Sequence, residues 1–106
     1  MPEGSRAVRF RGVECRLTQA GRVVRVEVAG EVDISVADEL GAWLLAAAGT
    51  HEQLALDLTK ITFMDSTGLH MLIRLRRDLP QRFHVEAVSD HVQGLLGVTG
   101  LKKFFD

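Results

Sequence analysis

The sequence predicts an α/β domain with a mixed sheet of four to five strands and helices mostly on one face. Runs in which apolar and polar residues alternate, typical of strands, are interleaved with runs of helical period. A short glycine turn joins the first two alternating runs, which favours an antiparallel hairpin. The 106 residues fit one domain. We expect it to span residues 1–106, with a core over about 13–105 and residues 1–7 frayed.

The predicted hairpin comes first along the chain. In residues 13–17 and again in 23–28, every second side chain is apolar and the intervening ones are mostly charged or polar. Ala20 and Gly21 supply the turn between them. Because polar residues share one face of both strands, we expect that face of the sheet to be lightly covered.

Helices and further strands follow in alternation. A helix is predicted over about 36–47, with Ser35 as N-cap and Gly49 ending it. A strand at 54–58 precedes a helix at 67–79 that ends before Pro80, and a strand at 83–87 precedes a short helix at 91–97 and an apolar tail at 101–105. Right-handed crossovers make the strands joined through helices parallel.

Composition excludes several classes of function. Thirteen Lys and Arg against 14 Asp and Glu give a formal charge of −1, so we expect no direct binding to nucleic acid. No apolar run approaches the ~20 residues of a membrane span, and the first residues do not resemble a secretory signal. The single Cys15 excludes an internal disulfide. We therefore expect a cytoplasmic protein without a metal or cofactor.

The residues whose side chains are best suited to a chemical or binding role lie at 62–70, where a loop is expected to lead into the second helix. Asp65, Ser66 and Thr67 are all suitable N-caps, and the helix start favours an anion. The simplest interpretation is that one of these three residues only caps the helix. A nucleophilic Ser66 lacks the G-x-S-x-G pattern of hydrolases, and Gly68 stands one residue too far from Asp65 for an aspartic protease. Hence we expect no enzyme, and consider Ser66 as a regulated phosphate acceptor in a docking surface.

Three motifs in order carry a family resemblance. Residues 30–33 (GEVD), 56–69 (LDLTKITFMDSTGL) and 98–105 (VTGLKKFF) resemble a STAS domain of the bacterial anti-sigma factor antagonists. The resemblance covers about residues 13–105 and implies the STAS fold. It implies that the unphosphorylated protein binds an anti-sigma factor that is itself a GHKL-type serine kinase, and so releases a sigma factor. Phosphorylation by that kinase ends binding, and a phosphatase resets it.

The resemblance also assigns residues. Ser66 matches the phosphate acceptor, with Thr67 as a second hydroxyl that could be modified instead. The partner-binding surface would comprise Asp33, Ile34, Ser35, Asp65, Thr67, Gly68, Leu69 and His70. Family members often carry glycine where His70 stands. We expect a monomer or a weak dimer.

Two alternatives stay open. The domain could be a STAS scaffold that is never phosphorylated, or a subunit of a larger signalling or lipid-transport complex, in which case Ser66 is only a cap. A small-ligand sensor would need a pocket that the sequence does not reveal.

Overall fold

The computed structural model describes residues 6–105. Five strands and three α-helices alternate along most of it, with one short 3₁₀ helix at the end. In chain order they are β1 (Arg6–Phe10), β2 (Val13–Ala20), β3 (Val23–Val32), α1 (Ala37–Ala48), β4 (Gln53–Met64), α2 (Ser66–Asp78), β5 (Phe83–Val88), α3 (Asp90–Thr99) and η1 (Lys102–Phe104).

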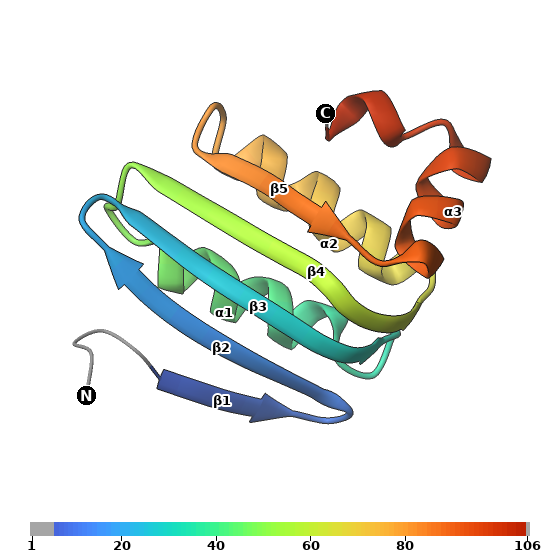
Figure 1. Cartoon of the computed structure of the whole chain (residues 1–106), viewed down its shortest axis with the longest axis horizontal. Helices are drawn as coiled ribbons and strands as arrows, with labels where there is room; N and C mark the ends of the chain where they lie inside the picture. Colours follow the sequence, from blue (N-terminus) through green and yellow to red (C-terminus); the bar gives the residue numbers. More distant parts are fainter. Residues whose placement is uncertain (1–5, 106) are drawn as a thin grey trace.

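The strands form one sheet in the order β1-β2-β3-β4-β5, as Figure 1 shows. The first three strands pair antiparallel, and β3, β4 and β5 pair parallel. The predicted mixed sheet is thereby confirmed, with a hairpin first and parallel strands after it. Strand neighbours in space are also neighbours in sequence, which keeps the connections short.

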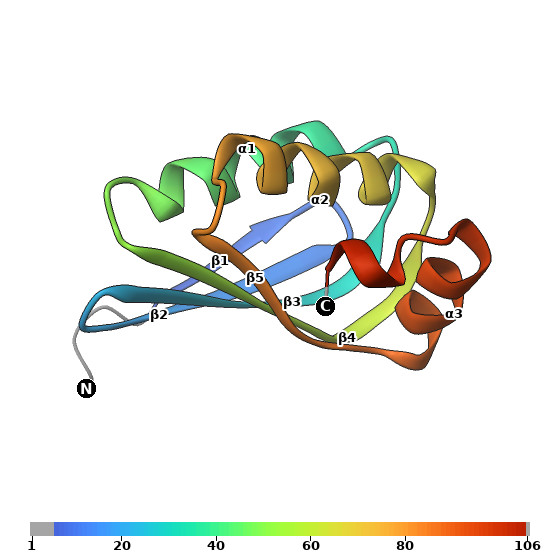
Figure 2. The ribbon, with the colours of Figure 1, turned by 90° about the horizontal axis from the view of Figure 1, so that it is seen from above.

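The two longer helices lie together on one face of the sheet (Figure 2). Alternate residues of the strands point toward them and are buried, among them Val24 and Val26 of β3 and Leu54 and Leu56 of β4. On the opposite face, the charged residues predicted to face solvent are more exposed than these apolar residues. Arg25 forms a bidentate ion pair with Glu86 there, at 2.7 Å for each contact.

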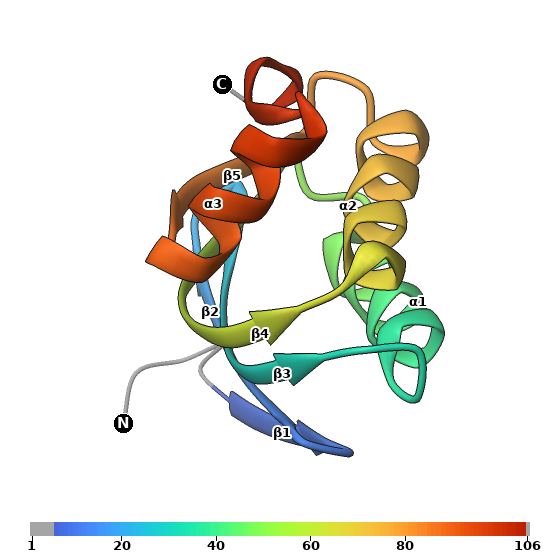
Figure 3. The same ribbon diagram turned by 90° about the vertical axis from the view of Figure 1, so that its right-hand side faces the viewer.

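The third helix does not join α1 and α2. In Figure 3 it stands apart from them, and its contacts are mainly with β4. The Ser89 side chain accepts a hydrogen bond from Val92 N–H at 3.2 Å and so caps α3. Helix α3 therefore flanks the part of β4 that extends beyond β5.

Among the helices of residues 6–105, none is long and apolar enough to cross a membrane.

The N-terminal region differs from expectation. Residues 6 and 7 were predicted to be frayed, but they belong to β1, which pairs with β2. The physical reason is tertiary: Phe10, at the end of β1, packs edge-on against Trp43 of α1, with ring centroids 5.7 Å apart. Residues 1–5 lie outside the described part of the chain.

Two predicted boundaries around the site were wrong. Strand β4 runs to Met64 rather than ending at Leu58, so residues 62–64 are strand and not loop. Helix α1 has Val36, not Ser35, at its N-cap, without a side-chain cap. Ser35 instead bonds to Asp33, whose carbonyl accepts the first N–H groups of the helix. The predicted ends at Gly49 and before Pro80 are confirmed.

Candidate functional site

The site lies where β3 and β4 end side by side and each leads into a helix (Figure 3). Val32 and Met64 are paired at these ends. Asp65 N–H donates to the Val32 carbonyl at 3.2 Å, which ties the β4–α2 turn to the β3–α1 loop. Residues distant in sequence, Asp33 and Asp65, therefore belong to one end of the molecule.

Asp65 is the N-cap of α2. Its Oδ1 accepts Thr67 N–H at 2.9 Å, and the Thr67 hydroxyl donates to the same oxygen. The Asp65 carbonyl accepts the N–H groups of Gly68 and Leu69, at 3.1 and 3.3 Å. Among the three hydroxyl or carboxyl residues predicted as caps, it is thus Asp65 that satisfies the helix start.

Ser66 occupies the first position of α2 and is exposed. The cap hydrogen bonds run from Thr67 to Asp65, so they do not cover the Ser66 side chain. His70, one turn further along α2, is exposed as well. The first turn of α2 therefore presents a serine hydroxyl to solvent on a rigid, capped support.

The β3–α1 loop repeats the same turn chemistry. Asp33 Oδ1 accepts Ser35 N–H at 2.9 Å and the Ser35 hydroxyl at 2.6 Å. These hydrogen bonds, the side-chain one first, lower the pKa of Asp33 below its ordinary value because they favour the ionised carboxylate. Between them Ile34 projects outward with 79% of its surface exposed. The loop thus displays a fixed carboxylate beside an exposed aliphatic side chain.

Gly68 and Leu69, predicted to lie at the partner surface, are both buried. A Cβ on Gly68 would stand 2.5 Å from Met64 Cγ and 3.1 Å from Val32 Cγ1. Leu69 retains only 4% of its exposure and belongs to the core. Gly68 lets α2 approach the strand ends because it has no Cβ, and the helical period turns the Leu69 side chain toward the sheet.

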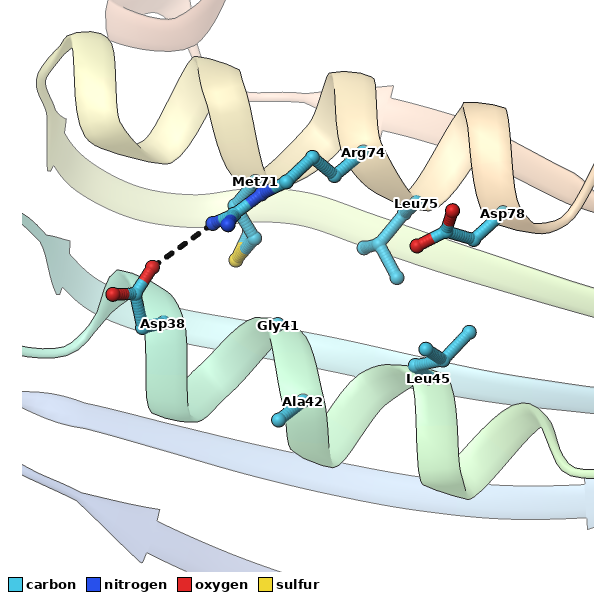
Figure 4. A pocket seen from close by; sticks show the side chains of 8 residues that line it. All are labelled: Asp38, Gly41, Ala42, Leu45, Met71, Arg74, Leu75 and Asp78. Carbon is cyan, nitrogen blue, oxygen red and sulfur yellow. Dashed lines mark hydrogen bonds and ion pairs between the residues drawn. The ribbon is translucent and has the colours of Figure 1, made fainter.

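A groove runs from this site between α1 and α2. Its first hollow, of about 400 Å³, is lined by residues of both helices and the β3–α1 loop: Ile34, Ala37, Asp38, Thr67, His70, Ile73 and Arg74. A second hollow of about 210 Å³ follows, shown in Figure 4. Arg74 of α2 reaches across to Asp38 of α1 at 2.9 Å, where the two hollows meet.

Two residues beside the site were missed by sequence reasoning. Phe63, 41% exposed, packs against His91 of α3 with ring centroids 5.4 Å apart and ring planes tilted by 39°. His91 Nε2 also lies 3.2 Å from the Met64 carbonyl, to which it donates a hydrogen bond. The missed signal is the continued strand: once β4 is known to reach Met64, Phe63 is recognised as an aromatic residue two positions before the Asp65 cap.

Comparisons with known proteins agree with this architecture. The family model described as "Mlab, STAS domain" matches residues 15–106. The chain belongs to the STAS domain family. Among curated STAS relatives, it is 33% identical over 82 residues to the anti-sigma-B factor antagonist of Staphylococcus epidermidis, covering 73% of this chain and 75% of that protein. The antagonist of Staphylococcus aureus strain NCTC 8325 is 31% identical over 90 residues, covering 80% and 82%.

Solved structures show the same STAS fold. The crystal structure of an anti-sigma factor antagonist from Mycobacterium paratuberculosis has a TM-score of 0.78 at 28% identity, covering 88% of this chain and 82% of that one. The anti-sigma factor antagonist SpoIIAA in its unphosphorylated form has a TM-score of 0.70 at 22% identity, covering 84% and 83%. The expected STAS fold is confirmed.

Proposed function

We propose that this STAS domain is an anti-sigma factor antagonist whose binding is switched by phosphorylation of Ser66. The curated relatives with more than 30% identity carry the antagonist name and match most of the chain, which supports the general role. The observation that carries the switch is the exposed Ser66 hydroxyl at the capped start of α2, beside the Asp33 loop. The partner is an anti-sigma factor with GHKL-type serine kinase activity.

The local geometry favours Ser66 over Thr67 as acceptor. A phosphate acceptor must place its oxygen in the kinase active site without first unfolding. The Thr67 hydroxyl is half-buried and donates to Asp65, so its modification would remove a cap hydrogen bond. Ser66 carries no such role in the cap, and its modification leaves the Asp65–Thr67 bonds intact.

The switch needs no change in the fold. A phosphate adds a charge of about −1.5 to −2, and a helix N-terminus tolerates that charge. A partner seated over Ser66 meets the added bulk and must remove water from a dianion. Each 1.4 kcal/mol of lost binding free energy weakens affinity about tenfold, so a few kcal/mol end the interaction. A phosphatase acting on exposed Ser66 then restores the binding form.

The test is phosphorylation by candidate anti-sigma kinases with ATP, followed by intact and peptide mass measurement. We expect one added phosphate on the wild type and on Thr67→Val, and none on Ser66→Ala. Binding of the kinase, measured by calorimetry, is expected with unphosphorylated protein and lost after phosphorylation. Phosphate on Thr67 in the wild type would overturn the assignment of the acceptor.

The scaffold alternative gives a different result in the same experiment. A constitutive STAS subunit would bind its partner equally well before and after phosphoserine is placed at position 66. Ser66→Ala would then have the same partner affinity as the wild type, and neither protein would gain a phosphate from the kinase. The control is Thr18→Ala, which removes an exposed hydroxyl on β2 instead.

A further inference from the structure

The outer face of α2 places Ser66 next to a titratable side chain. Ser66 and His70 are four residues apart in one continuous helix and are both exposed. Side chains at this spacing are neighbours on a helix surface, with Cβ atoms about 5–6 Å apart. A phosphate on Ser66 and the imidazole of His70 are therefore within contact distance.

Charged side chains of α1, α2 and the two turns share this end of the molecule with His70. Across the groove, Asp38 of α1 pairs with Arg74 of α2 at 2.9 Å. In the neighbouring turns, Asp33 accepts hydrogen bonds from Ser35, and Asp65 from Thr67. Arg77, two turns beyond His70, lies 3.3 Å from Asp78.

We propose that His70 is the intramolecular partner of a phosphate on Ser66, and that their ion pair makes the phosphorylated domain sensitive to pH. This rests on the proposed modification of Ser66. The imidazolium donates a hydrogen bond to a phosphate oxygen, a charge-assisted contact along the outer face of α2. No backbone rearrangement is required, because one uninterrupted helix holds both residues.

A phosphoserine and a histidine ordinarily change charge over the same pH range. The second pKa of a phosphoserine is about 6 and the ordinary pKa of histidine is about 6.5. Each charge stabilises the other, so the pair raises the pKa of His70 and lowers that of the phosphate by equal amounts. At exposed sites we expect about half a pH unit for each.

The sign of the effect follows from these directions. The ion pair is most populated between the lowered pKa of the phosphate and the raised pKa of His70, at about pH 5.5–7. Above that window His70 loses its proton, and the phosphate again presents an uncompensated dianion to the partner. Repulsion of the partner is therefore expected to strengthen as the pH rises from about 6 to 8.

The test places phosphoserine at position 66 during translation, so that no kinase is needed. ³¹P spectra report the phosphate and ring-proton NMR reports the histidines, across about pH 4.5–8.5. We expect the pKa of His70 to rise by about half a unit on phosphorylation, and the phosphate pKa to be higher in His70→Gln than in the wild-type sequence. His84→Gln on β5 is the matched control and leaves both values unchanged.

The proposal is overturned if the pKa of His70 is the same with and without the phosphate, or if His70→Gln leaves the phosphate titration unaltered. The first comparison uses the unmutated sequence and does not depend on folding of a variant. If instead the ion pair forms but no anti-sigma kinase modifies Ser66, the proposed function fails while the pairing of the two residues stands.

Discussion

The Asp65 amide donates a hydrogen bond to the Val32 carbonyl at 3.2 Å, and this contact joins the two turns that make the candidate site. It follows directly on the parallel pairing of Val32 with Met64. The ends of β3 and β4 are thereby held in register, and the helices that follow start side by side. The turn that precedes Ser66 is consequently anchored to the ends of the two strands.

Removing the cap should weaken the domain measurably. Asp65→Ala deletes the acceptor for Thr67 N–H and for the Thr67 hydroxyl. We expect a loss of about 1 kcal/mol in the free energy of unfolding, measured by urea denaturation. Asp65→Asn keeps an acceptor oxygen and should lose much less. Equal losses for both variants would show that the cap hydrogen bonds do not contribute.

Gly68 is expected to be intolerant of a side chain. Gly68→Ala places a methyl group 2.5 Å from Met64 Cγ, so the helix start or the Met64 side chain must move. We expect a destabilisation of about 1–3 kcal/mol. Gly94→Ala in α3, where a Cβ meets no atom within 4 Å, is the control and should be neutral or stabilising. Thermal denaturation compares the two variants, and a Gly68→Ala protein as stable as Gly94→Ala would show that close packing at Gly68 is unimportant.

Exposed Ile34 should contribute to binding and not to stability. Its side chain is 79% exposed beside Asp33, so Ile34→Ala removes little buried surface. We expect unfolding free energy within about 0.5 kcal/mol of wild type and partner affinity reduced about tenfold. Val98→Ala, at an 88% exposed position on α3, should change neither. Unchanged affinity of Ile34→Ala would remove this loop from the proposed interface.

Asp33 should titrate at an unusually low pH. Hydrogen bonds from Ser35 lower the pKa of this carboxyl from 3.8, and Ser35→Ala, which removes the side-chain bond, should raise it again. A lowered native pKa gives stability that is present above the unfolded pKa and is lost as the pH falls through the native value. In a plot of stability against pH, the loss of stability on acidification should therefore occur at higher pH in Ser35→Ala than in the wild type. NMR of the Asp33 carboxyl measures the pKa directly.

Cys15 should be inert in the native protein. Its side chain is fully buried, and burial first, with Glu14 second, raises the pKa of the thiol to about 12. Because the thiolate is the reactive form, a thiol reagent such as DTNB should react only through unfolding. The reaction rate should follow urea concentration in parallel with global unfolding. Fast reaction in buffer alone would contradict the burial of Cys15.

The local pattern of apolar and polar residues was sufficient to predict the central strands and helices of the fold. Alternation in β2 and β3 and the helical stripe of α1 predicted type and position, because side-chain burial imposes a period on each element. The Asp65 and Ser66 positions at the start of α2 were also predictable, since capping chemistry depends on a few adjacent residues. Motif order supplied the STAS family, which the comparisons confirm.

Tertiary structure decided the rest. Strand β1 exists because β2 offers an edge and Trp43 offers a surface for Phe10, and neither is visible in residues 6–10. Register shifts between β3 and β4 blur the alternation beyond Leu58, which hid the extension to Met64. The sequence by itself determined which residue types stand at the start of α2. The parallel pairing of β3 with β4 brought Asp33 and Ile34 beside them, and the packing of α3 against β4 brought His91. Contacts between such distant segments leave no local period in the sequence.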